Sequence, residues 1–237
     1  MKYLNWDQKT ITDFSESNIN DLYENGYVFT RIGKGIMQQT RSIRINLNAF
    51  DPTSENRRIL KKTDGIILSK TVLPLNNYDY SLGKLAKDFY DNRFGTGIMS
   101  AQKIKEMLTD EKKSNFNFLL NYKTSAIDST NQVLPEKNQP VIHSDRSVIG
   151  YAICFANSII LHYSYPFYDL NNSPKDMGLG MMIRAIMHAK ETKLKYIYLG
   201  SLQRPSDTYK LQFNGLECFD GNLWISDIEK MKQILAI

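Results

Sequence analysis

The chain has 237 residues and a mass of 27.4 kDa, enough to bury a core in one large domain or two small ones. Hydrophobic residues make up 42% and charged residues 23%, which excludes a disordered, collagen-like or low-complexity chain. The sequence has no apolar run of about 18 residues, and its N-terminus is polar, so we expect neither a membrane span nor a secretory signal. We therefore expect a cytoplasmic protein.

The charge balance is mildly basic. Lysine and arginine number 30 against 25 aspartate and glutamate residues, which gives a net charge of +5 and an isoelectric point near 9.0. This charge is compatible with an anionic partner such as nucleic acid, a phosphorylated cofactor or an acidic peptide. Cys154 and Cys218 are too few for a disulfide framework or a four-thiolate metal site, and no metal is expected.

Residues 1–120 alternate between helical and strand patterns. Ile43, Ile45 and Leu47 alternate with polar neighbours, which is the period of a half-buried strand. Thr53 or Ser54 is placed to cap a basic helix. In chain order the patterns predict helix 17–27, strands within 27–50, helix 55–62, strand 65–73 and helical segments over 78–120 with a break around 93–97.

The remaining chain divides into a polar segment and an α/β segment. Residues 121–147 are polar and contain prolines, so they are expected to form a linker or an exposed loop. From there on, the patterns predict a hairpin of strands 148–155 and 158–165, helix 181–192, strand 196–199 and a second helix around 206–213.

A glycine-containing segment precedes the helix expected from Met181. The run Lys175-Asp176-Met177-Gly178-Leu179-Gly180 is similar to the [Q/R]-x-x-G-x-[G/A] turn of the GNAT-type acyltransferase fold. Glycines without side chains allow backbone N–H groups to approach a phosphate, and a helix N-terminus adds partial positive charge. The same two glycines also fit a simple tight turn from strand to helix.

Further motifs are spread over most of the chain. In chain order they are Leu22 … Gly26 … Arg31 … Gly33, Arg44-x-x-x-x-x-Phe50-x-Pro52-x-Ser54-x-x-x-Arg58, Arg93 … Gly97-x-Met99, Phe167-Tyr168-Asp169, Gly178-Leu179-Gly180, Tyr198-Leu199-Gly200 and Tyr209-Lys210-x-x-Phe213 … Glu217. Together these stretches resemble the aminoacyl-tRNA–protein transferases, the arginyl and leucyl transferases of the N-end rule.

The sequence also departs from that family pattern. The family's cysteine-rich segment would fall between Gly33 and Arg44 and has no counterpart, so no metal cluster is expected. Phe94 stands where the family has a histidine, and Leu170 stands where it has a proline. These differences indicate a divergent member, and they leave open whether its donor and acceptor are those of the family.

The resemblance implies an α/β fold of two tandem GNAT-like N-acyltransferase lobes, with mixed sheets flanked by helices. Residues 1–120 would form a degenerate first lobe, and residues 121–147 the linker or exposed loop. Residues 148–237 would form the second lobe, which carries the glycine turn.

The resemblance also implies a reaction. The amine of a protein or peptide N-terminus, acidic in many family substrates, would attack the ester of an aminoacyl-tRNA, with no other cofactor and no covalent enzyme intermediate. The donor amino acid is left open between leucine, arginine and another residue. The implied catalytic residues are Asp169, Tyr209 and Lys210; the tRNA phosphates would meet Gly178, Leu179, Gly180, Arg57, Arg58 and Lys61; and Arg44 and Arg93 would bind the acceptor.

Simpler readings of these residues remain open. The arginines and lysines of helix 55–62 also fit a solvated helix face, Asp169 also fits a turn cap, and Tyr209 also fits the core. Two other functions stay as alternatives. One is an acyl-CoA-dependent N-acyltransferase that uses acetyl-CoA, and the other is a catalytically inactive module that binds peptide N-termini or tRNA.

Overall fold

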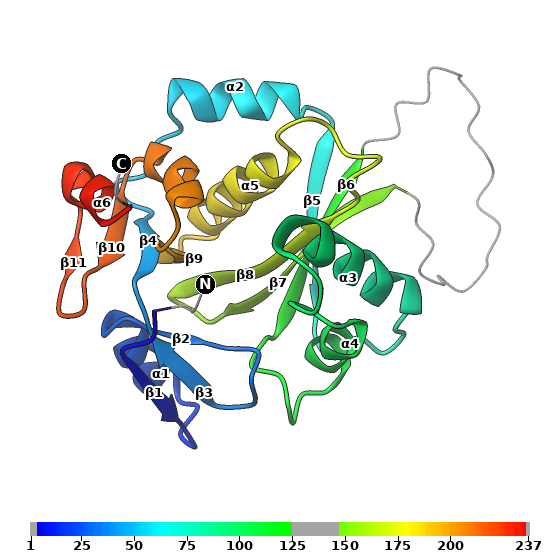
Figure 1. The fold of residues 1–237 in the computed structure, drawn as a ribbon, viewed down its shortest axis with the longest axis horizontal. Coiled ribbons are helices and arrows are strands. Elements are labelled where there is room, and N and C mark those ends of the chain that lie inside the picture. The colour runs from blue at the N-terminus through cyan, green and yellow to red at the C-terminus, as the bar shows by residue number, and fades with distance from the viewer. Residues whose placement is uncertain (1–3, 125–146, 236–237) are drawn as a thin grey trace.

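The computed structural model describes residues 4–124 and 147–235, and its centre is a mixed sheet of eight strands (Figure 1). Six of the seven neighbouring strand pairs in this sheet are antiparallel, and the parallel pair is β8 with β9. From edge to edge the strands are β11 (Trp224–Ile225), β10 (Leu216–Phe219), β4 (Ser42–Asn46), β9 (Tyr196–Ser201), β8 (Ile160–Tyr168), β7 (Val148–Ala156), β6 (Phe118–Thr124) and β5 (Ile66–Val72).

This sheet takes strands from both halves of the chain. β4, β5 and β6 precede residue 125, whereas β7 to β11 follow residue 147, and β4 lies between β10 and β9. The expected division into lobes 1–120 and 148–237 stays a prediction. The two segments share one hydrogen-bonded sheet, so neither buries its strands independently.

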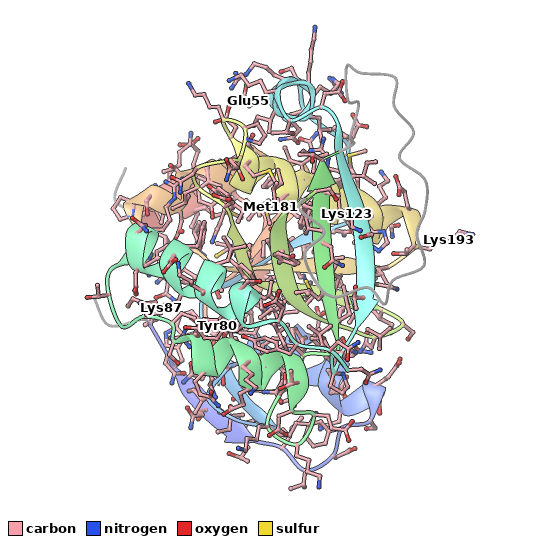
Figure 2. The ribbon with its side chains drawn as sticks, turned by 90° about the vertical axis from the view of Figure 1, so that its right-hand side faces the viewer. Glu55, Tyr80, Lys87, Lys123, Met181 and Lys193 are labelled. Atoms are coloured by element: carbon pink, nitrogen blue, oxygen red, sulfur yellow. The ribbon has the colours of Figure 1, made fainter. Side chains whose placement is uncertain are left out.

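Helices cover both faces of the sheet, and each face has its own apolar core (Figure 1). Figure 2 shows this from the side, with Glu55 and Met181 in the upper layer and Tyr80 and Lys87 in the lower one. The expected α/β class, with a mixed sheet flanked by helices, is confirmed. One face carries α2 (Ser54–Lys62), α5 (Met177–Glu191), the 3₁₀ helix η1 (Pro205–Gln212) and α6 (Ile228–Leu235); the other carries α1 (Glu16–Glu24), α3 (Tyr80–Phe94), α4 (Ala101–Thr109) and a small sheet of β1 (Asp7–Thr10), β3 (Ile36–Gln39) and β2 (Tyr27–Phe29).

Helix α2 forms where its local sequence predicts it. Thr53 accepts a hydrogen bond from the Asn56 N–H at 3.2 Å, and the Asn56 side chain accepts one from the Thr53 N–H at 3.1 Å. This capping box satisfies amides that a helix start leaves open. The predicted start and end of the helix are therefore confirmed to within one residue.

The expectation of helix up to residue 120 and a linker from 121 is wrong at its boundary. α3 and α4 fill 80–109, but residues 118–124 form strand β6, which pairs with β5 and β7. The strand is buried from both sides over most of its length, so its apolar run lacks the alternation that marks a strand. The rest of the expected linker, 125–146, lies outside the described residues.

The C-terminal hairpin is confirmed and contains an irregularity. β7 and β8 pair antiparallel, and their register shifts between Ile153, opposite Tyr165, and Cys154, opposite Tyr163. Ser164 is therefore an extra residue in β8. Such a bulge twists a strand and redirects the side chains on either side of it.

An aromatic cluster packs between α1 and the sheet. The Tyr23 hydroxyl lies 2.8 Å from Nδ1 of His162, and the Tyr23 ring packs edge-on against Tyr198 with centroids 4.8 Å apart. His162 is 4% exposed, and burial lowers the pKa of its imidazole from 6.5 to about 3. The imidazole is therefore neutral in the folded protein at pH 7.

The buried His162 predicts a pH dependence of stability. The pKa of the His162 imidazole is lower in the folded than in the unfolded protein. The contribution of the neutral imidazole to the free energy of unfolding is therefore complete above pH 6.5 and is lost as the pH falls toward 3. Between pH 6.5 and 5 we expect a loss of about 2 kcal/mol in the free energy of unfolding, at about 1.4 kcal/mol per pH unit. Urea titrations of wild type and His162→Gln measure it. The variant should lose this slope, and equal slopes in the two proteins would contradict the assignment.

Candidate functional site

The parallel strands β8 and β9 separate part-way along their length. They pair only at Ile160 with Tyr196, Leu161 with Ile197 and His162 with Tyr198. Beyond these pairs, β8 continues to Tyr168 along β7, and Ser201 of β9 pairs with β4. We call the two diverging segments, residues 163–168 and 199–201, the β8–β9 fork. The bulge at Ser164 lies at its start.

Two of the residues predicted to be catalytic lie on the β9 side of this fork. The Lys210 ammonium donates to the Ser201 carbonyl at 2.8 Å and lies 3.5 Å from Asp207 Oδ1. Lys210 is 6% exposed, and burial lowers the pKa of its ammonium despite the nearby carboxylate. Tyr209 is 42% exposed, so the alternative reading of Tyr209 as a core residue is wrong. Burial raises the pKa of the Tyr163 hydroxyl on β8, and Tyr209 contributes to the same shift.

The expected glycine turn before a helix at Met181 is wrong in its boundary. α5 begins at Met177, so Gly178, Leu179 and Gly180 form its first turn. Asp176 precedes the helix in the left-handed region, with φ 66°, and no side chain caps the helix start. The Leu179 and Gly180 N–H groups donate to the Asp176 carbonyl, and the Met177 N–H donates to the Pro174 carbonyl. The helix start therefore offers an anion the Gly178 N–H and the partial positive charge of the helix.

The two glycines also allow close packing. A Cβ on Gly180 would lie 2.6 Å from Thr63 Oγ1, and one on Gly178 would lie 3.2 Å from the ring of Tyr168, the last residue of β8. Thr63 cannot easily move, because it is buried and its hydroxyl accepts a hydrogen bond from Arg184 at 2.7 Å. Gly180 therefore permits the end of α2 to meet the start of α5.

The basic helix α2 lies beside this helix start. Lys62 of α2 pairs with Asp176 at 2.9 Å. Arg58 pairs with Glu55 on its own helix, and Arg57 donates to the Pro52 carbonyl. Lys61 is exposed. The structure thus places the predicted phosphate-binding residues of α2 and α5 next to each other. The basic side chains of α2 also remain compatible with an ordinary solvent-exposed helix face.

Three motif segments meet at the end of β8. Arg93, near the end of α3, donates from Nη2 to the Tyr168 hydroxyl at 3.1 Å, and the Tyr168 ring in turn covers Gly178. Next to Arg93, Phe94 lies beneath the Arg204 guanidinium at 5.5 Å. Arg204 leads into η1, which carries Tyr209 and Lys210. These contacts connect α3, β8, α5 and η1 around the fork.

Asp169 follows β8 and caps a turn. Its carboxylate accepts hydrogen bonds from the Asn171 N–H at 2.9 Å and from the Asn172 side chain at 2.7 Å. These hydrogen bonds lower the pKa of its carboxyl, and the carboxylate is ionised at pH 7. Asp169 also borders a cavity of about 610 Å³ between α3 and the end of β8, together with Asp79 and Asp88. No described contact links Asp169 to Lys210.

The surroundings of Arg44 favour a structural role over the expected role in binding an acceptor. Arg44 is 3% exposed, in the middle of the sheet, and its guanidinium donates to Glu217 at 2.6 Å and to both oxygens of Glu24. The rings of Tyr196 and Trp224 lie 3.8 Å and 4.0 Å from it. The internal carboxylates occupy the donors that a ligand would need, so Arg44 connects β4, β10 and α1 instead.

Sequence reasoning missed Tyr168 and Arg204 as site residues. Tyr168 stood inside a matched motif, but only its neighbour Asp169 offered obvious chemistry. Arg204 lies outside the matched motifs, and its contact with Phe94 joins segments that are 110 positions apart. Within residues 4–124 and 147–235, no group of three or more His, Cys, Asp or Glu side chains is placed to hold a metal ion.

Known proteins similar to this chain include aspartate/glutamate leucyltransferases. The one from Dinoroseobacter shibae is 28% identical over 187 residues, which cover 77% of this chain and 61% of its own length. The one from Saccharophagus degradans is 26% identical over 211 residues, which cover 85% of this chain and 80% of its own length. The sequence of this chain is similar to these leucyltransferases over most of its length. The resemblance expected from the motifs is confirmed, although this chain spans only about three fifths of the first relative.

Solved structures show weaker similarity. L-PGS from Bacillus licheniformis aligns with a TM-score of 0.43 and 11% identity, over 78% of this chain and 52% of its own. FemX aligns with a TM-score of 0.42 and 9% identity, over 78% of this chain and 60% of its own. No family model matches the chain. Among the described helices, none is long and apolar enough to cross a bilayer.

The contact between α2 and α5 predicts the effect of adding one methyl group. Gly180→Ala should lower the free energy of unfolding by about 1–3 kcal/mol, because the overlap with Thr63 outweighs the better helix propensity of alanine. Gly178→Ala is the matched control in the same helical turn, and we expect a smaller loss because the half-buried Tyr168 ring can shift. Urea unfolding compares them. A Gly180→Ala protein as stable as wild type would refute the close contact.

The environment of Arg44 predicts a large stability effect. Arg44→Met should lower the free energy of unfolding by about 3–5 kcal/mol, since it leaves Glu217 inside the sheet without its cation. Lys84→Met, which breaks the exposed pair with Asp88, should leave stability close to wild type. If Arg44→Met unfolds like wild type but fails to bind peptide, Arg44 is a ligand-binding residue after all.

Proposed function

We propose that the protein transfers an amino acid from an aminoacyl-tRNA to the free N-terminal amine of a protein or peptide. The observation that carries this proposal is the contact series from Arg93 through Tyr168 to Gly178. These residues come from three separate motifs of the transferase family, and they meet beside the fork where Lys210 lies. The names of the relatives, aspartate/glutamate leucyltransferases, support the same reaction.

The reaction needs positioning more than activation, because the ester of an aminoacyl-tRNA is already reactive. The acceptor nitrogen attacks the ester carbonyl carbon, a C–N bond forms, and the C–O bond to the terminal ribose breaks. The proton lost by the amine goes to the ribose oxygen. Holding amine and ester in contact is worth about 7–11 kcal/mol of the barrier, and no covalent enzyme intermediate is required.

The start of α5 and helix α2 form the proposed donor site. The Gly178 N–H lies in a helix start that no side chain caps, which suits a phosphate near the 3′ end of the tRNA, and Leu179 and Gly180 complete the same turn by donating to the Asp176 carbonyl. Arg57, Arg58 and Lys61 of α2 extend positive charge along the adjacent surface. The charge of this surface suits a polyanion.

Lys210 and Tyr209 are the groups proposed to act on the ester. The Lys210 ammonium is held at the fork by the Ser201 carbonyl and Asp207, and burial strengthens its interaction with any charge that develops there. We assign it to the tetrahedral oxyanion, which such a fixed donor stabilises. Tyr209, exposed beside it, is assigned to the 3′-terminal nucleotide.

The cavity beside Asp169 is the proposed entrance for the acceptor. Asp79 and Asp169 border it and suit the N–H groups of a peptide's N-terminal amine, whereas Asp88 is paired with Lys84, which also lines the cavity. Arg93 reaches the Tyr168 hydroxyl at its border. Asp169 would orient the amine. We propose acidic acceptors and a leucyl donor by analogy with the named relatives, and a cytoplasmic location because charged tRNA is found there.

A transfer assay tests the proposal. Radiolabelled amino acids from a mixed pool of charged tRNA are offered with peptides that start with Asp, Glu, Lys, Arg or Ala, and acetyl-CoA is run in parallel. We expect label in one class of peptide and none from acetyl-CoA. Lys210→Met should lower the rate about 10²–10³-fold, whereas Lys113→Met, at an exposed position, should not.

Two results would count against the proposal. Acetyl transfer without transfer from tRNA would indicate an acyl-CoA-dependent enzyme on the same scaffold. Binding of charged tRNA or peptide without any turnover would indicate a binding module.

A further inference from the structure

Arg31 approaches the fork from the face of the sheet opposite α5. It lies in the turn between β2 and β3, and its backbone N–H donates to the Tyr165 hydroxyl at 3.1 Å. Its guanidinium lies 6.0 Å from the centre of the Tyr165 ring. Tyr165 belongs to the part of β8 that no longer pairs with β9. Arg31 therefore borders the same fork as Lys210, from the other side.

The guanidinium of Arg31 has an unusual environment. It is partly buried, and its Nη1 donates to the sulfur of Met99 at 3.2 Å, a weak acceptor. No carboxylate of residues 4–124 and 147–235 lies within 4 Å of it. Arg44, by contrast, has two carboxylate partners. A partly buried charge without an anion is costly, and a ligand that brings a carboxylate removes this cost.

A buried asparagine fixes the turn that carries Arg31. Asn115 is 5% exposed, and its side-chain oxygen accepts from the Gly35 N–H at 2.7 Å. Its side-chain nitrogen donates to the carbonyls of Thr30 and Gly33 at 2.9 Å and 2.8 Å. These hydrogen bonds join both ends of the turn to one side chain. Arg31 is therefore held in place before any ligand arrives, which favours binding.

We propose that Arg31 binds the side-chain carboxylate of the acceptor's first residue and so selects acidic N-termini. The inference deepens the proposed function and rests on it for the identity of the ligand. A guanidinium binds a single carboxylate through two parallel hydrogen bonds. A tRNA backbone would require a row of cations, whereas the immediate walls here are Met99 and Tyr165. The basic helix α2 lies on the opposite face.

Peptide binding tests this role without any tRNA. Two fluorescent peptides that differ only in the first residue, Asp or Asn, are titrated with the full chain, and anisotropy gives each affinity. We expect wild type to bind the Asp peptide about 10-fold to 100-fold more tightly, as a hydrogen-bonded charge pair allows. Arg31→Met should abolish this preference, and Arg31→Lys should restore part of it.

Two further variants control for general effects. Lys34→Met removes a charge from the same turn and should leave the Asp-to-Asn ratio unchanged. Arg93→Met should weaken both peptides by a similar factor, because Arg93 borders the proposed entrance for any acceptor. Thermal unfolding of each variant shows whether the fold is retained.

The outcomes separate this inference from the proposed function. A preference for Asp that survives Arg31→Met, or that disappears in Arg93→Met instead, overturns the role of Arg31. Equal or undetectable binding of the two peptides by wild type also overturns it. If the preference depends on Arg31 but no amino acid is transferred from tRNA, the recognition of acidic N-termini stands and the transfer reaction fails.

Discussion

The parallel pairing of β8 with β9 stops at His162 and Tyr198, and the rest of the site depends on this separation. Each strand then follows its other neighbour, β7 or β4, and the bulge at Ser164 twists β8 away. Because the strands diverge, no sheet hydrogen bonds join their ends, and side chains from other elements can enter the space between them. Lys210 reaches the Ser201 carbonyl on one arm, and Tyr168 connects the other arm to α3 and α5.

The two faces of the sheet provide different chemistry to this fork. On one face, α2 and the start of α5 present cations and the positive end of a helix, which suit the phosphates of a tRNA. On the other face, the turn with Arg31 and the cavity lined by Lys84 and Asp169 present charges of both signs, which suit a short zwitterionic group such as a peptide N-terminus. In the proposed reaction the donor and the acceptor approach from opposite sides and meet between the strands, where Lys210 is fixed.

Features encoded within a few residues were predictable from the sequence, whereas those made by distant partners were not. The capping box of α2 lies within four positions, and its helix was predicted to within one residue. β6 was missed because a strand buried on both faces has no alternation to detect. The ion pairs of Arg44 were not predictable because its partners, Glu24 and Glu217, lie 20 and 173 positions away. The motifs predicted the transferase resemblance, but not that Tyr168 would join three of them.

In the proposed reaction, an aminoacyl-tRNA binds across the fork. Hydrogen exchange with a charged tRNA whose ester is replaced by a stable amide tests this binding, because it reports the contact surface without turnover. We expect protection of residues 163–168, of the first turn of α5 and of η1, with weaker protection by uncharged tRNA and none by coenzyme A. Protection confined to other surfaces, such as the β1–β3–β2 sheet, or protection of the fork by coenzyme A alone, would contradict it.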